Sequence, residues 1–268
     1  MFALLPSMLR ALALVLGTPT LLPRIDARAT GAHDLGLDAD LRGLVELEVL
    51  PTFVQGADFR LAASLGLSTW FRGNNRTESP VRLSPQQIRY PVALHLWFDS
   101  DLGPIGPFVF HQSNHDVDTD DARLNRETVA YEVYGCAWQA AAFRLDAGIY
   151  YDRGTTLALK KQVYPFDHFL LGAHLSTRNV LPESLRPLDL IVDLEAIAHR
   201  GGDESPPFVD LNVSVDLGVR LRGNPPGAGT LRPLLRLQRL ENYQHLGDPA
   251  HLVLMLGLEV SSAALSRP

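Results

Sequence analysis

Hydrophobic and polar residues alternate along most of this chain, and this alternation is its strongest structural signal. In residues 209–222 the apolar positions recur at every second place without a break, and the positions between them carry Asp, Asn, Ser, Gly and Arg. A period of two places successive side chains on opposite faces of a β-strand. The pattern therefore predicts strands with one apolar face and one polar face.

The same alternation predicts 11 or about 12 strands, and helical periodicity is almost absent. The predicted strands cover residues 41–49, 59–71, 90–98, 108–115, about 125–138, 143–149, 166–176, 188–196, 209–222, 231–241 and 252–260. Residues 72–87 are expected to form a long loop, and residues 154–164 fit either a strand or a loop. Residues 30–40 are expected to be a short polar lead before the first strand.

Charged residues lie in the middle of the predicted polar faces, and these faces must therefore be in contact with water. The charged residues are Glu46, Glu48, Arg144, Asp193, Glu195, Asp216 and Arg220. A soluble β-sandwich would place them on its outer surface, whereas a barrel would place them in a polar lumen with the Leu and Val face against lipid. Short and long connections alternate, as in outer-membrane barrels. We therefore predict an all-β fold, an antiparallel transmembrane β-barrel of about 12 strands in the bacterial outer membrane, with the sandwich as the alternative.

Aromatic residues near many predicted strand ends fit the interfacial belts of such barrels. These residues are Trp70, Tyr90, Trp97, Trp138, Tyr150, Tyr151 and Tyr164.

The first 29 residues read as a secretory signal peptide. Arg10 precedes a short apolar run that ends at an Ala-x-Ala cleavage pattern in residues 27–29. A disordered or membrane-tethered N-terminus is the alternative. Residues 30–268 are expected to form a single outer-membrane β-barrel domain. Cys136 is the one cysteine, so an internal disulfide is excluded. The balance of 24 basic against 30 acidic residues argues against nucleic-acid binding.

Candidate chemistry lies in the hairpin that begins with residues 108–115. His111 and Ser113 are two residues apart, so on a strand they share one face. A serine hydroxyl becomes a nucleophile when a base removes its proton, and the base needs a partner that orients it. If the loop turns about Thr119, Ser113 lies opposite Asn125 and His111 opposite Glu127. The alternative is that these are ordinary residues at the rim of a hairpin.

The segment His111-Gln-Ser-Asn114, with Asn125-Arg126 twelve residues after the serine, resembles the active-site region of outer-membrane phospholipase A. That family is a twelve-stranded barrel that deacylates phospholipids. Outer-membrane lipid A deacylases are similar in having a His and a Ser two apart on a strand. Residues 111–115 are also similar to the H-x-S-S-H motif of largely uncharacterised outer-membrane proteins.

The resemblance implies roles for individual residues. Ser113 would be the nucleophile, His111 the general base, and Asn125 the residue that orients it, with Glu127 as a second candidate for that role. Asn114 and His115 would contact the substrate. The alternation from Asn125 onward puts Val129, Tyr131 and Val133 on the same face, and this points the site outward to lipid.

The resemblance also implies calcium near the oxyanion position and a homodimer. Asp121 stands where the phospholipase has a serine ligand, and Asp116 and Asp118 could supply further oxygens, the ligands that calcium prefers. A solvated acidic loop is the alternative. The sequence thus predicts an acyl-ester hydrolase that acts on phospholipid or lipid A. The alternative function is a non-enzymatic barrel that passes or binds small molecules.

Overall fold

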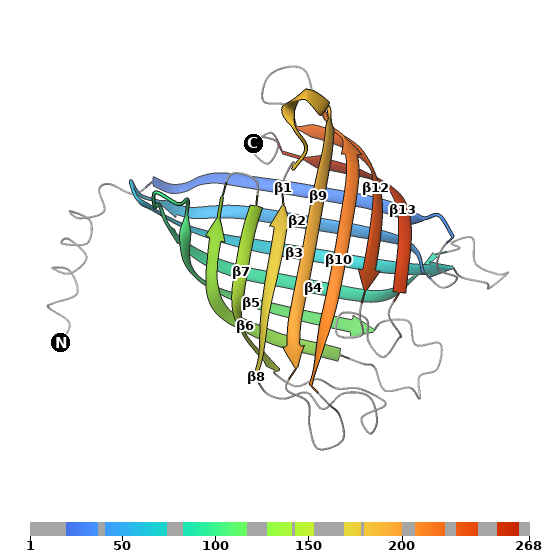
Figure 1. Cartoon of the computed structure of the whole chain (residues 1–268), viewed down its shortest axis with the longest axis horizontal. Coiled ribbons are helices and arrows are strands. Elements are labelled where there is room, and N and C mark those ends of the chain that lie inside the picture. The colour runs from blue at the N-terminus through green and yellow to red at the C-terminus, as the bar shows by residue number, and fades with distance from the viewer. Residues whose placement is uncertain are drawn as a thin grey trace, which may run out of the picture.

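The alternating segments form one antiparallel sheet that closes on itself as a barrel (Figure 1). The computed structural model describes residues 20–36, 41–73, 83–116, 128–140, 143–152, 169–177, 180–199, 207–222, 229–240 and 251–262. The sheet has thirteen strands. The two-residue β11 follows β10 in the chain and pairs with the same strand, β12, so it extends β10. Twelve long strands therefore make up the wall, and the predicted all-β barrel of about twelve strands is confirmed.

The strands are β1 (Thr20–Asp34), β2 (Leu41–Gln55), β3 (Phe59–Gly73), β4 (Leu83–Phe98), β5 (Ile105–Asp116), β6 (Thr128–Gln139), β7 (Phe143–Asp152), β8 (Phe169–Thr177), β9 (Leu188–His199), β10 (Phe208–Val219), β11 (Leu221–Arg222), β12 (Thr230–Leu240) and β13 (His251–Ser261). A single 3₁₀ turn, η1 (Glu183–Leu185), precedes β9. No helix among the described residues is long and apolar enough to cross a membrane.

The barrel closes where the first strand pairs with the last. β1 pairs with β13 from Arg28 opposite Ser261 to Asp34 opposite Met255, and on its other side it pairs with β2. Every long strand thus has two neighbours, and closure removes the unpaired edges of an open sheet. The strand junction β13–β1 is called the closing seam below.

The first strand was the main omission of the sequence prediction. Residues 30–34, expected as a polar lead, belong to β1, and so do residues 20–29, the end of the predicted signal peptide. The outward positions of β1 include Ala27, Ala29 and Gly31, which are too small to give a clear apolar alternation. The signal-peptide boundary at residue 29 stays a prediction, and cleavage there would remove the first two thirds of β1.

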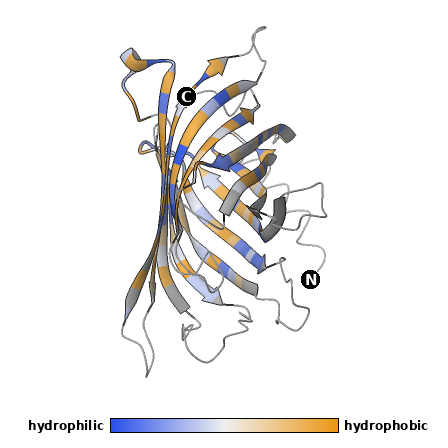
Figure 2. Cartoon of the chain, turned by 90° about the vertical axis from the view of Figure 1, so that its right-hand side faces the viewer, coloured by the Kyte–Doolittle hydropathy of each residue, from blue (hydrophilic) through white to orange (hydrophobic). Residues whose placement is uncertain are grey.

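Hydrophobic and hydrophilic residues alternate along the strands (Figure 2). The exposed positions of most strands are apolar, and the inward positions are largely polar. Exposed outward side chains include Val45, Leu47, Leu65, Leu67, Val92, Leu94, Leu235, Leu237, Leu256 and Leu258. The mid-strand charges predicted to face the lumen all line an internal cavity of about 440 Å³. In a closed sheet each long strand pairs with a neighbour on both sides, which satisfies the backbone polar groups as a hydrocarbon environment requires.

Three of the aromatics assigned to interfacial belts instead fill the interior. Trp70, Trp97 and Tyr150 are at most 4% exposed, because their positions have inward parity. Trp70 packs with Leu44, Val253 and Met255 in one interior cluster, and Trp97 and Tyr150 belong to a second cluster. Tyr164 and the segment 154–164 lie outside the described residues.

Candidate active site on the outer wall

His111 and Ser113 lie together on the outward face of β5, as their spacing predicts. Both are partly exposed, as is Val109 on the same face, whereas Phe108 and Gln112 are buried on the inward face. Both residues lie in the half of β5 that leads to the connection 117–127, away from the shorter connection 99–104. The site therefore lies in the wall, near the end that carries the longer connections.

The predicted register of the hairpin is wrong. Ser113 lies opposite Ala130 rather than Asn125, and His111 lies opposite Glu132 rather than Glu127. The displacement is five residues in both cases (130 − 125 and 132 − 127), and an odd displacement exchanges the two faces of a strand.

As a result, Tyr131 and Val133 face the interior, where they are at most 2% exposed, and not the lipid. The predicted orienting residues Asn125 and Glu127 lie outside the described residues. The outward orientation of the site, which the sequence inferred from the parity of β6, rests instead on the burial pattern of β5.

The two neighbours of Ser113 in the motif point in different directions. Asn114 is fully buried on the inward face, where its side-chain oxygen accepts a hydrogen bond of 3.0 Å from the Gln112 amide. His115 is on the outward face, with its ring edge-on to Tyr90 at a centroid distance of 5.8 Å. Of the two predicted substrate contacts, His115 shares a face with Ser113 and Asn114 does not.

Glu132 is the residue that sequence reasoning missed. It lies directly across the β5–β6 ladder from His111, and its carboxylate accepts a hydrogen bond of 2.5 Å from the Tyr134 hydroxyl. Across the β6–β7 ladder it faces Tyr151. Among the outward positions of the described strands it is the one carboxylate. Its acidic side chain is visible in the sequence, but only the β5–β6 register shows that it lies on the outward face opposite His111.

These outward polar side chains form one group, called here the outer-wall patch. Its members are Tyr90, His111, Ser113, His115, Glu132, Tyr134 and Tyr151. They come from four neighbouring strands, β4 to β7, while the outward positions of β8 to β10 are almost entirely Leu, Val and Ala. In the described chain, no hydrogen bond joins the His111 imidazole to the Ser113 hydroxyl in this arrangement.

The predicted calcium ligands lie at the end of β5 and beyond it. Asp118 and Asp121, and the side chain of Asp116, lie outside the described residues. Within the described part of the chain, no group of three or more His, Cys, Asp or Glu residues is placed to hold a metal ion. The calcium site therefore stays a prediction.

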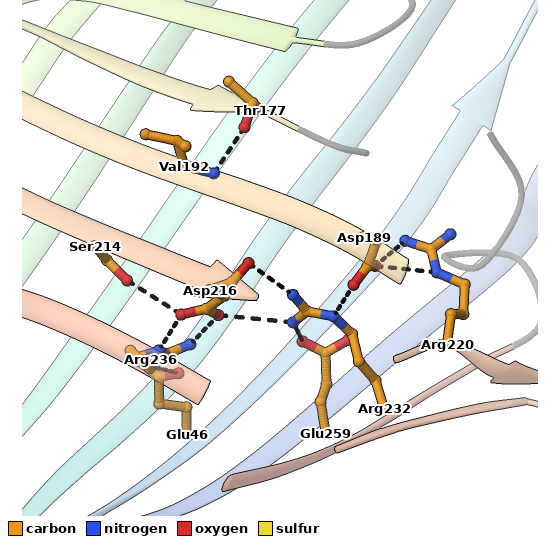
Figure 3. Close-up of polar contacts among 10 residues, drawn as sticks. All are labelled: Glu46, Thr177, Asp189, Val192, Ser214, Asp216, Arg220, Arg232, Arg236 and Glu259. Atoms are coloured by element: carbon orange, nitrogen blue, oxygen red, sulfur yellow. Dashed lines mark hydrogen bonds and ion pairs between the residues drawn. The ribbon is translucent and has the colours of Figure 1, made fainter. Parts of the chain in front are cut away.

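A second polar cluster lies inside the barrel, on the strands near the closing seam (Figure 3). Arg236 of β12 donates to both carboxylate oxygens of Asp216 at 2.7 and 2.9 Å and reaches Glu46 of β2 at 2.8 Å. Arg232 is 1% exposed and pairs with Asp189 at 2.6 Å. Because these charges neutralise one another, the cluster has the features of a structural network rather than of a reactive site.

Comparisons with known proteins find solved structures with a similar fold. No protein-family model matches the chain, and no curated protein matches it. The outer membrane phospholipase A from Escherichia coli aligns over 90% of this chain and 93% of its own, with 11% identity and a TM-score of 0.45. The Salmonella typhi outer membrane phospholipase, a dimer with bound calcium, aligns over 90% and 91%, with 13% identity and a TM-score of 0.47. The translocator domain of the autotransporter NalP from Neisseria meningitidis aligns over 96% and 94%, with 12% identity and a TM-score of 0.36.

Proposed function

We propose that this protein is an outer-membrane hydrolase that cleaves acyl esters of membrane lipids at the outer-wall patch. The observation that carries the proposal is the presence of a hydroxyl, an imidazole and a carboxylate on neighbouring strands of a wall whose outer face is mostly apolar. A lipid-facing ionisable group lowers the stability of a barrel, by an amount that depends on its depth. A folding requirement alone does not explain such a group, whereas a reaction with lipid does.

The proposed reaction uses Ser113 as nucleophile and His111 as general base. The serine oxygen bonds to the carbonyl carbon of the ester while His111 takes the hydroxyl proton. The bond to the alcohol part of the lipid then breaks, and that alcohol leaves with the proton from His111. Water attacks the acyl-serine in the same way and releases the fatty acid, which restores both side chains.

The location of the patch supports a lipid substrate over a soluble one. The connections 56–58, 99–104 and 140–142 lie at the end of the barrel where β1 begins and β13 ends, and in outer-membrane barrels the shorter turns face the periplasm. His111 and Ser113 would then lie in the outer half of the membrane, beside the acyl esters of outer-leaflet lipids. Phospholipid and lipid A share this ester chemistry.

The test is the release of fatty acid from defined lipids by the purified full chain. Detergent micelles containing either phospholipid or lipid A are incubated with the wild type, Ser113→Ala and His111→Ala, and the products are measured by mass spectrometry. We expect each variant to lose at least about 100-fold in rate while it remains a folded barrel. The control is Thr69→Ala, which removes an outward hydroxyl on β3. Fatty-acid release that survives Ser113→Ala would refute the proposal.

A barrel that conducts small molecules is the competing function, and the interior weighs against it. The lumen is crossed by ion pairs between distant strands, such as Arg236 to Glu46, and it contains the packed side chains of Trp70 and Tyr131. Single-channel recording in a planar bilayer distinguishes the two functions. Stable conductance that Ser113→Ala leaves unchanged, together with no lipid release, would favour the channel.

A further inference from the structure

We infer that Glu132 is the positioning residue for His111, in the place where the sequence motif predicts Asn125 or Glu127. This inference rests on the proposed function, because it assigns a role within the same site. It comes from the β5–β6 register alone, since neither the spacing of the motif nor its resemblance to other proteins includes Glu132.

The geometry brings the two side chains within reach of each other. Residues directly opposite on antiparallel strands have Cβ atoms about 4.5–5.5 Å apart. His111 and Glu132 are such a pair, and both project from the outward face. From this separation a carboxylate and an imidazole meet by rotation about their side-chain bonds, without movement of the backbone.

Tyr134 supplies the second contact that this role requires. Its hydroxyl lies two residues along the same face of β6 and donates to one oxygen of Glu132 at 2.5 Å. A carboxylate has about four acceptor sites, so Glu132 can accept from the imidazole of His111 in addition. A carboxylate held between a phenol and an imidazole has a fixed direction, which a freely rotating glutamate would lack.

The chemistry explains why a carboxylate is useful at this position. When His111 takes the proton of Ser113 it becomes a cation, and a cation facing lipid lacks the stabilisation that water would provide. A neighbouring carboxylate compensates this charge in the transition state and fixes which ring nitrogen carries hydrogen before the reaction. Glu132 thus acts through His111 and makes no contact with the ester itself.

The test compares Glu132→Gln, Tyr134→Phe and Cys136→Ala in the fatty-acid release assay. Cys136→Ala is the matched control, because Cys136 lies on the same face of the same strand. We expect Glu132→Gln to lower kcat about 10²–10⁴-fold with little change in KM, since the carboxylate acts on the transition state. Tyr134→Phe should lower kcat less than about tenfold, and Cys136→Ala should leave both constants unchanged.

A second readout does not depend on catalysis. In the full chain labelled with ¹⁵N-histidine, the ring nitrogen shifts of His111, assigned with His111→Asn, report which tautomer is present. We expect one tautomer in the wild type and a mixture in Glu132→Gln.

The outcomes separate the two proposals. Wild-type kcat in Glu132→Gln, with Ser113→Ala inactive, would overturn the role of Glu132 and leave the hydrolase intact. An inactive wild type would refute the hydrolase. In that case the tautomer ratio of His111 still tests the contact between His111 and Glu132. A ratio that is the same in the wild type and in Glu132→Gln would overturn this contact, and a changed ratio would support it.

Discussion

Replacing Arg236 with methionine tests whether the interior ion pairs stabilise the closing seam. β12 and β2 are separated in the sheet by β13 and β1, so the Arg236–Glu46 pair crosses the seam on the inside of the barrel. Asp216 of β10 receives two further hydrogen bonds from the same guanidinium. Methionine keeps much of the side-chain volume and removes the charge, so the variant isolates the ionic contribution.

The expected loss follows from the burial of the partners. The side chain of Asp216 is 4% exposed and that of Arg236 is 9% exposed, and removing one member of a buried pair costs about 3–5 kcal/mol, because the remaining charge is left desolvated. Glu46 is 35% exposed and regains water, so its bond adds only about 0–1 kcal/mol. We therefore expect Arg236→Met to lower the free energy of unfolding by about 3–5 kcal/mol.

Urea unfolding in detergent micelles, followed by tryptophan fluorescence, measures this difference. The matched control is Arg28→Met, because Arg28 and Glu48 form a 2.8 Å pair with side chains 42% and 31% exposed, for which we expect about 1 kcal/mol or less. The double variant Arg236→Met with Asp216→Asn should be more stable than Arg236→Met alone, since Arg236→Met leaves the buried Asp216 carboxylate with Arg232 as its ion-pair partner, at only 3.6 Å. Equal losses in Arg236→Met and Arg28→Met would refute the argument from burial.

Three further predictions use the same protein. Gly218→Ala should cost about 1–3 kcal/mol in the urea assay, because its Cβ would lie 2.4 Å from Arg232 Nε, whereas Gly31→Ala, with open space around it, should cost less than about 1 kcal/mol. Trp70→Ala should cost about 3–5 kcal/mol by leaving a cavity in the interior cluster. If Asp116, Asp118 and Asp121 hold calcium, a chelator should lower lipid release and added calcium should restore it. An unchanged rate in the chelator would remove calcium from the mechanism.

The sequence was sufficient to predict the barrel because most strands show the alternation of apolar and polar residues within their own segment. In β10, apolar residues alternate with Asn212, Ser214 and Asp216, and this local pattern already determines which face turns inward. The pattern was insufficient for β1, where small outward residues, Ala27, Ala29 and Gly31, interrupt the apolar alternation. Trp70 and Trp97 were misplaced because the belt was inferred from their nearness to strand ends, whereas parity counted from the outward Leu and Val residues of the same strands gives an interior position.

The candidate site required long-range information that no single segment contains. The shared face of His111 and Ser113 depends only on their spacing within one strand, so it was predictable. Their partner on β6 depends on how the chain turns through residues 117–127, and each additional residue at the turn exchanges the two faces of the following strand. A displacement of five residues therefore replaced Glu127 by Glu132 and turned Tyr131 inward.

The same register explains why the sequence analysis missed Glu132. In the sequence, Glu132 lies between Tyr131 and Val133, and an acidic residue between apolar neighbours is most simply read as facing the lumen. The structure assigns the opposite parity, since Tyr131 and Val133 fill the interior and Glu132 is left on the apolar side of the wall. A charge on that side lowers the stability of a barrel. The polar side chains of His111 and Tyr151 lie opposite it on the two neighbouring strands, and Tyr134 donates to it.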